Sequence, residues 1–145
     1  MSKETKNNHG PVTFIVRWIL GVLFLLAGYW KVFELGVMQH AGKFFIEGFS
    51  ETWIPEWLLW TLGVTIPYLE LTAGVFLVIG FRLRETLIAL GCLLIITTYG
   101  HALQQPLFDI AGHTFTRLVL IIFLLAYGWA EDRLTVDYWL THRST

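Results

Sequence analysis

The chain has 145 residues, of which 55% are hydrophobic and only 14% are charged, and its net charge is −1. Soluble domains carry about 25% charged residues, and a soluble fold of this length could not bury so much apolar side chain, because small domains keep a large surface. The composition therefore predicts an integral membrane protein, and the near-zero charge gives no electrostatic basis for binding nucleic acid. One cysteine, Cys92, cannot form an internal disulfide, so any redox role requires a bound cofactor or a partner subunit.

The first apolar segment covers residues 13–34 and follows a polar tail, residues 1–12. About 20 residues at 1.5 Å each are enough to cross the hydrocarbon core of a bilayer. Gly21 and Gly28 lie seven residues apart and so share one face of the predicted helix, where small residues let a neighbouring helix approach closely.

The segment that follows, up to about Glu56, mixes charged and aromatic residues, including Lys43, Phe44, Glu51 and Trp53. This mixture is typical of the membrane interface rather than of the hydrocarbon core. We therefore expect an interfacial segment between the first and second helices.

The second predicted helix, residues 57–79, contains Gly63, Pro67 and Glu70, and Pro55 is placed to begin it. Proline inside a helix clashes with the carbonyl four residues earlier, which here belongs to Gly63. We expect a bend at this point that turns Glu70 toward the interior.

Two further apolar segments, residues 85–101 and 113–130, are short for complete spans unless they extend into their polar flanks. The predicted fold is thus all-α: a polytopic membrane protein with a four-transmembrane-helix bundle in residues 13–130. Residues 131–145 form the second polar tail. Lys and Arg gather at the end that carries both tails, so the positive-inside rule predicts a cytoplasmic N-terminus and a cytoplasmic C-terminus.

Five polar residues stand inside or beside the apolar segments, and the predicted topology gathers them in the outer half of the bundle: Lys31, Glu70, His101, His113 and Arg117. A charge near the bilayer centre costs about 2.5–3.5 kcal/mol on insertion scales, so it is kept when it pairs, lines a cavity or has a function.

Each of these residues also has a structural interpretation. The cations could extend to the headgroups, and the histidines could be plain interface residues, since they belong to no metal or haem motif. Glu70 is too short to reach the headgroups, so it either forms a structural ion pair with Lys31 or Arg117 or is functional.

The order of the motifs resembles the DoxX family of small bacterial membrane proteins. The segments that carry the resemblance are RWILGVLFLLAGYWKVF, PYLELTAGVFLVIGFRLR, HALQQPLFDIAGHTFTRLVL and RLTVDYWL. The resemblance implies a four-helix bundle in the bacterial inner membrane, with Lys31, Glu70 and Arg117 as its polar positions. Some DoxX proteins are subunits of thiosulfate:quinone oxidoreductase, and others associate with redox enzymes that handle sulfur compounds.

These observations favour a membrane subunit of a quinone-linked or sulfur-compound oxidoreductase assembly, at most a non-autonomous part of an enzyme. Glu70 is then the catalytic proton carrier, and the ligand-binding residues are Lys31, Arg117, His101 and His113. No metal site is predicted, the sequence specifies no cofactor, and quinone is the candidate ligand. The expected partners are the lipid bilayer, a redox subunit and a second copy of the chain. The alternatives are a small transporter, which the apolar inner half disfavours, and a non-catalytic assembly partner.

Overall fold

A computed structural model describes residues 9–104, 114–128 and 132–142, and all regular secondary structure in these ranges is helical. Among the described residues, three helical segments are long and apolar enough to cross a membrane, namely Gly10–Glu34, Glu56–Ile79 and Leu83–Gln104, and the apolar helix Thr116–Gly128 is shorter. The predicted all-helical membrane class is therefore confirmed, whereas the count of four spans stays a prediction. The elements in chain order are α2 (His9–Tyr29), η1 (Trp30–Glu34), α3 (Val37–His40), η2 (Ala41–Glu47), α4 (Glu56–Ile79), α5 (Leu83–Gln104), α6 (Thr116–Phe123), η4 (Leu124–Gly128) and α7 (Val136–His142), where η marks a π-helical segment.

Local sequence explains both ends of α4. Pro55 is extended at the N-cap, and Glu56 places an acid in the first turn, where the helix dipole favours negative charge. At the other end Gly80 adopts the left-handed conformation with φ 73°, and the amides of Gly80 and Phe81 donate to carbonyls of the last turn. This is the Schellman arrangement, which glycine permits without a steric penalty.

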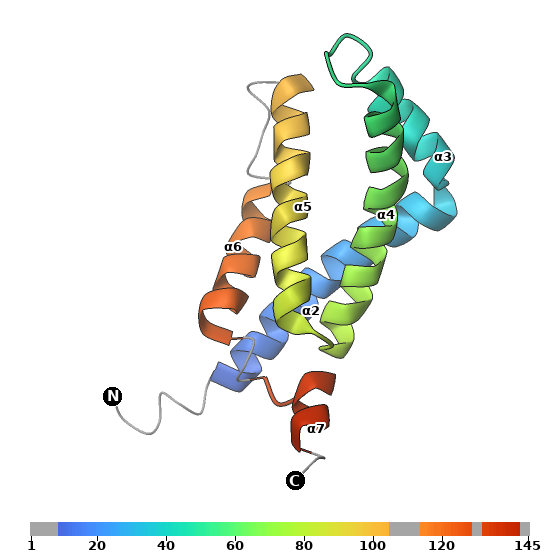
Figure 1. The fold of residues 1–145 in the computed structure, drawn as a ribbon. Helices are drawn as coiled ribbons and strands as arrows, with labels where there is room; N and C mark the ends of the chain where they lie inside the picture. Colours follow the sequence, from blue (N-terminus) through green and yellow to red (C-terminus); the bar gives the residue numbers. More distant parts are fainter. Residues whose placement is uncertain (1–8, 105–113, 129–131, 143–145) are drawn as a thin grey trace.

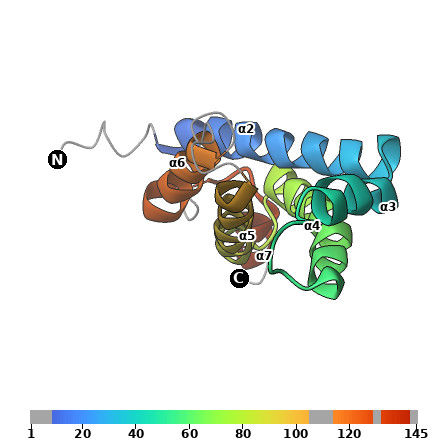
Figure 2. The ribbon, with the colours of Figure 1, turned by 90° about the horizontal axis from the view of Figure 1, so that it is seen from above.

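Helices α2 and α4 form the closest pair in the bundle. In Figure 1, α2 crosses the other helices obliquely while α4 and α5 stand more upright, and Figure 2 shows α2 lying along one side of α4 and α5. Buried side chains of α2, α4, α5 and the α6–η4 segment fill the space between them, among them Leu20, Phe24, Leu77, Leu87, Leu90 and Ile121.

Glycines bring the backbones of α2 and α4 into contact, and we call this contact the α2–α4 seam. A Cβ at Gly28 would collide with the backbone of Leu71, with its Cα only 2.6 Å away, and a Cβ at Gly74 would lie 2.5 Å from the Cα of Leu25. The predicted close approach of a neighbouring helix on the Gly21–Gly28 face is therefore confirmed, since Gly21 also lies against Val78.

The chain between α2 and α4 packs along α4. It turns at Gly36, whose φ is 86°, and α3 and η2 then follow the first half of α4 to the upper end of the bundle in Figure 1. Ala41 and Phe49 are buried in this stretch, whereas Phe44 and Trp53 are exposed. The structure thus gives this segment a packed face on α4, and its predicted interfacial position is not confirmed.

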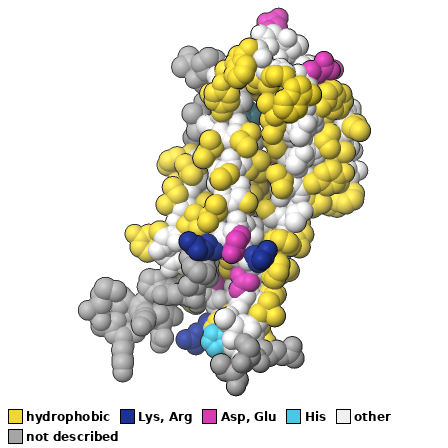
Figure 3. Space-filling view, in the orientation of Figure 1, with side chains coloured by type: hydrophobic (Ala, Val, Ile, Leu, Met, Phe, Trp, Pro, Cys, Tyr) yellow, Lys and Arg dark blue, Asp and Glu magenta, His cyan; other side chains and the backbone are white. Residues whose placement is uncertain are grey.

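The sides of the molecule are apolar and its charges gather toward its ends. Figure 3 shows hydrophobic side chains over the flank of the bundle, acidic side chains at the upper end, and a mixture with Lys and Arg near the lower end. Many large apolar residues are exposed on this surface, including Ile19, Leu26, Val75, Ile95 and Ile122. An apolar flank between polar ends is what a bilayer requires of a protein that spans it.

The described part of the C-terminal region packs against the lower end of the bundle. The hydroxyl of Thr135 accepts a hydrogen bond from the amide of Tyr138 and so caps α7. The carboxylate of Asp137 accepts hydrogen bonds of 2.9 Å from the amides of Arg82 and Leu83, at the start of α5. Residues 132–142 are therefore tied to α5 rather than projecting from the bundle.

Candidate functional site

A charged pair joins the α2–η1 segment to α4. The Nζ atom of Lys31 lies 2.5 Å from Oε2 of Glu70, and the Glu70 residue is only 3% exposed. Glu70 is the fifteenth residue of the 24-residue helix α4, so the pair lies well inside the apolar part of the bundle. Of the two candidate partners for Glu70, Lys31 is the one that forms the ion pair.

The course of the chain after η1 explains how Lys31 and Glu70 come to the same level. Segments α3 and η2 continue along α4 beyond the end of η1. The end of the first helix is thus not the end of the bundle, and Lys31 lies beside Glu70 within it.

The two sides of the pair are not equally enclosed. The side chain of Glu70 is 5% exposed, whereas that of Lys31 is 22% exposed, and an ammonium group has three donors. Lys31 also lies in the π-helical segment η1, and π-bulges in helices occur frequently at functional sites. The pair therefore combines a buried acceptor with a partly accessible donor.

His40 is a third polar group of this region, and the sequence analysis did not single it out. Its Nδ1 lies 2.8 Å from the carbonyl oxygen of Gly63, and the residue is buried. Because a carbonyl can only accept, Nδ1 carries the proton and donates. His40 lies between the candidate spans Gly10–Glu34 and Glu56–Ile79. Burial lowers the pKa of its ring, and the positive charge of Lys31 lowers this pKa further, whereas the Gly63 carbonyl and Glu70 raise it. The ring is therefore neutral at pH 7 and has an acceptor at Nε2. We call Lys31, Glu70 and His40 the seam cluster.

The other predicted site residues lie elsewhere or outside the described residues. Arg117 packs over the ring of Phe24 at 5.2 Å, so its described partner is an aromatic face rather than Glu70. His101 is half-buried in the last turn of α5. His113 lies outside the residues that the structure describes. The roles predicted for all five residues stay predictions.

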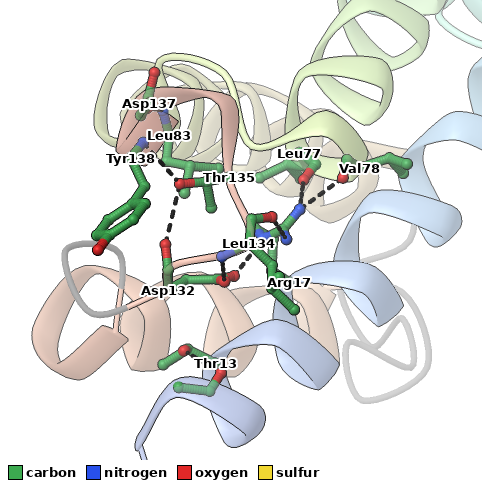
Figure 4. Close-up of polar contacts among 11 residues, drawn as sticks. Thr13, Arg17, Leu77, Val78, Leu83, Asp132, Leu134, Thr135, Asp137 and Tyr138 are labelled. Atoms are coloured by element: carbon green, nitrogen blue, oxygen red, sulfur yellow. Dashed lines mark hydrogen bonds and ion pairs between the residues drawn. The ribbon is translucent and has the colours of Figure 1, made fainter. Parts of the chain in front are cut away.

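A second buried charge lies at the lower end of the bundle, where Arg17 forms what we call the end cluster with Asp132 and the carbonyls around it (Figure 4). The Nε atom of Arg17 is 2.7 Å from the Asp132 carboxylate, and Nη1 is 2.6 Å from the carbonyl oxygens of both Leu77 and Val78. Nη2 donates to the carbonyl of Leu134. Arg17 is only 1% exposed.

The contacts of the end cluster indicate a structural role. Leu77 and Val78 lie in the last turn of α4, where the helix dipole favours a cation, and the Leu77 carbonyl also accepts a hydrogen bond from the amide of Gly80. Asp132 also accepts a hydrogen bond from the amide of Leu134, so both of its carboxylate oxygens are occupied. Arg17 therefore links α2, the end of α4 and the C-terminal region through hydrogen bonds that satisfy every participating group.

The fold and the seam cluster define a class: a multi-pass helical membrane protein with a charged pair held between its closest-packed helices. The family comparison places the chain within that class. Residues 10–108, more than half of the chain, match the model of the family described as methylamine utilisation protein MauE, and the chain belongs to this family. Among curated proteins and among solved structures, none matches the chain.

The resemblance to the DoxX family is therefore wrong, because the family that matches is MauE. The physical reason lies in the motifs that carried it. Apolar helices with glycine at contact positions, an internal proline and basic flanks are imposed by the bilayer on many membrane families. Such segments show reliably that a protein lies in a membrane, but they do not show to which membrane-protein family it belongs.

The matched region includes the whole seam cluster and Arg17, but Arg117 and Asp132 lie beyond it. His40 and Asp132 were both missed in the sequence analysis. The signal for His40 was indirect: Pro67 cannot donate to the carbonyl of Gly63, so that carbonyl needed a donor from another element. For Asp132 the only signal was the position of Arg17 inside the first apolar segment, because an arginine that becomes buried there needs an anionic partner.

Proposed function

We propose that the chain is a membrane accessory protein of a methylamine-utilising system, and that the seam cluster is its working site. The observation that carries the proposal is the Lys31–Glu70 pair. Charged groups within spanning segments are costly and are kept mainly where they pair or have a function. An accessory role fits a chain whose single cysteine cannot form an internal disulfide, because the redox chemistry then belongs to a partner.

A quinone-linked role for the same site is the more specific form of this proposal. A quinone dissolves in the bilayer and presents carbonyl oxygens, which are acceptors for the remaining N–H donors of Lys31. The 22% exposure of the Lys31 side chain supports access from the surroundings of the bundle. Glu70 would exchange the proton. The sequence analysis predicted that Arg117 and Lys31 together form a cationic pocket. The contact of Arg117 with the Phe24 ring supports instead a site in which Lys31 is the cation.

The proposed location is the bacterial inner membrane, with the N-terminus and the C-terminus in the cytoplasm. Helix α2 begins and α7 ends at the same end of the bundle (Figure 1). Arg82, Arg84 and Arg133 are exposed toward that end, whereas Glu51 and Glu56 are exposed at the other. The positive-inside rule then supports this orientation. A reporter fused after Thr145 should be active only as a cytoplasmic reporter, and periplasmic activity would contradict the orientation.

Growth complementation tests the main proposal. In a methylamine-using bacterium deleted for its own MauE-family gene, this chain should restore growth on methylamine. Glu70→Gln and Lys31→Met should accumulate in the membrane yet fail to restore growth, whereas Glu85→Gln, which removes an exposed charge from α5, should behave as the unsubstituted chain. No growth from the unsubstituted, membrane-inserted chain contradicts the methylamine role, and full growth from Glu70→Gln contradicts the site.

Ligand binding tests the quinone form separately. Equilibrium dialysis of the purified protein in nanodiscs with a short-chain quinone should give saturable binding that weakens at least tenfold in Lys31→Met, about 1.4 kcal/mol. Glu85→Gln is again the control. Equal binding by both variants would show partition into lipid alone and would remove quinone from the proposal. Uptake of labelled methylammonium into vesicles would instead favour the transporter alternative.

A further inference from the structure

Pro67 leaves a carbonyl without its helical partner inside α4. In a regular helix the carbonyl of Gly63 would accept a hydrogen bond from the amide of residue 67, but proline has no N–H. Water is absent from the bilayer core, so a carbonyl left open there is costly. The imidazole of His40 occupies this acceptor at 2.8 Å, and it comes from a different element, α3.

Steric fit accompanies the hydrogen bond. A Cβ at Gly63 would lie 2.7 Å from the Cα of Ala41 and 2.8 Å from its Cβ, so only glycine allows this approach. The rings of Phe44 and Phe45 each lie 5.5 Å from the imidazole. His40 is therefore held between its own segment and the face of α4 that Pro67 has opened. We call this contact of His40 and Ala41 with Gly63 and Pro67 the proline joint.

The proline joint lies next to the charged pair. Pro67 precedes Glu70 by three residues, and His40 follows Lys31 by nine in the segment that turns at Gly36. His40 is also close enough to interact electrostatically with both Lys31 and Glu70. The joint thus ties the segment that carries Lys31 to the helix that carries Glu70.

We propose that His40 is a positioning residue for the Lys31–Glu70 site and that it acts as a pair with Pro67. By donating to the carbonyl that Pro67 leaves open, His40 holds the α3–η2 segment against α4 and keeps Lys31 in contact with Glu70. The consequence for growth on methylamine rests on the proposed function, but the contact itself does not, and it can be measured on purified protein.

A double-variant cycle with a chemical readout tests the pairing. The measurement is the acylation of Lys31 by a membrane-permeant amine reagent in nanodiscs, quantified by mass spectrometry relative to Lys43, which is exposed in η2. Glu70→Gln defines the labelling of a Lys31 that has lost its carboxylate. His40→Leu should raise Lys31 labelling several-fold toward that level, because the segment is no longer held on α4.

Two variants should restore protection. His40→Asn keeps an N–H donor at the same distance from the backbone as Nδ1, although its side chain does not titrate. In Pro67→Ala/His40→Leu, residue 67 regains an amide that satisfies the carbonyl of Gly63 within the helix, so the loss of His40 should have much less effect. Pro67→Ala alone should label as the unsubstituted chain. Recovery in both variants supports a positioning role.

Three results would overturn the proposal: folded His40→Leu with unchanged Lys31 labelling, His40→Asn that labels as strongly as His40→Leu, or no suppression by Pro67→Ala. If His40→Leu alone does not fold, the double variant decides, since its recovery supports the pairing and its failure contradicts it. Growth assays on the same variants separate the two proposals: protected Lys31 without any growth by the unsubstituted chain would contradict the methylamine role and leave the joint intact.

Discussion

The seam cluster and the end cluster both place a cation from the first helix against α4, yet they differ in how completely their groups are hydrogen bonded. Arg17 donates to one carboxylate and three backbone carbonyls and is 1% exposed. Lys31 makes its described bond to Glu70 alone, and its side chain is 22% exposed. A charge with all of its partners supplied by the fold holds structure together, whereas a partly accessible donor beside a buried carboxylate can take part in binding.

The choice of cation agrees with this difference. Guanidinium presents five donors in a rigid plane and stays charged, so one Arg can satisfy a carboxylate and several carbonyls at once. Lysine is a point charge on a flexible stem, and it changes partner or protonation state more readily. The end cluster therefore needs arginine, and the seam cluster does not.

The largest effect is expected from Arg17→Met. The substitution leaves Asp132 as an uncompensated buried charge and removes the Arg17 donor from the carbonyls of Leu77 and Val78. Breaking a buried pair in this way costs about 3–5 kcal/mol, so thermal unfolding in detergent should show a large loss or no folded protein. Arg17→Lys should recover only part of the stability, because lysine cannot reach all four acceptors. Normal melting of Arg17→Met would mean that the end cluster is not structural.

A bulky residue at Gly28 tests whether the seam itself holds the charged pair. Gly28→Leu forces a side chain against the backbone of Leu71, and overpacking of this kind costs about 1–3 kcal/mol. The matched control is Gly91→Leu on α5, where an added Cβ meets nothing within 4 Å. Only Gly28→Leu should lower the melting temperature and raise Lys31 labelling. Equal effects at both positions would show that the Lys31–Glu70 pair does not depend on the close contact of α2 with α4.

The same chemical change in the two clusters gives the sharpest contrast. Asp132→Asn and Glu70→Gln each remove one buried carboxylate charge while keeping the side chain's size, and each leaves a cation behind. Asp132→Asn should chiefly lose stability, by about 1–3 kcal/mol, with growth reduced only as far as folded protein is lost. Glu70→Gln should lose growth at near-normal folded amounts. Thermal unfolding of the two variant proteins and growth of the same strains distinguish the two roles. The reverse pattern would mean that the seam cluster is structural and the end cluster functional.

The smallest effect is expected at the cap of α5. Asp137→Ala removes the acceptor of the Arg82 and Leu83 amides, and losing a cap of this type costs about 0.5–2 kcal/mol. Unfolding should be modestly easier, while Lys31 labelling stays unchanged because the seam cluster lies elsewhere. Asp137→Asn keeps an acceptor oxygen and should recover most of the loss. A change in Lys31 labelling would reveal coupling between the two ends of the bundle.

Much of the helical framework followed from one-dimensional patterns. The segment 57–79 corresponds to α4, and Pro55 begins it as expected. The Gly21–Gly28 face was assigned to close helix contact, which the structure confirms. These predictions succeeded because the bilayer imposes length and apolar composition on a span, and because helical periodicity assigns residues to faces without further information.

The sequence by itself determined a helical membrane protein, the places of its apolar segments and the short list of costly charges that need an explanation, since burial of charge and apolar run length depend on local composition. Only the tertiary structure decided which charges meet. Lys31 met Glu70 because the chain after Gly36 packs along α4, Arg17 became fully buried because residues 132–142 fold back onto it, and His40 entered the site through a carbonyl opened by Pro67. These contacts join segments that are far apart in the sequence. They depend on how the helices pack against one another, and the spacing of residues along the chain does not determine that packing.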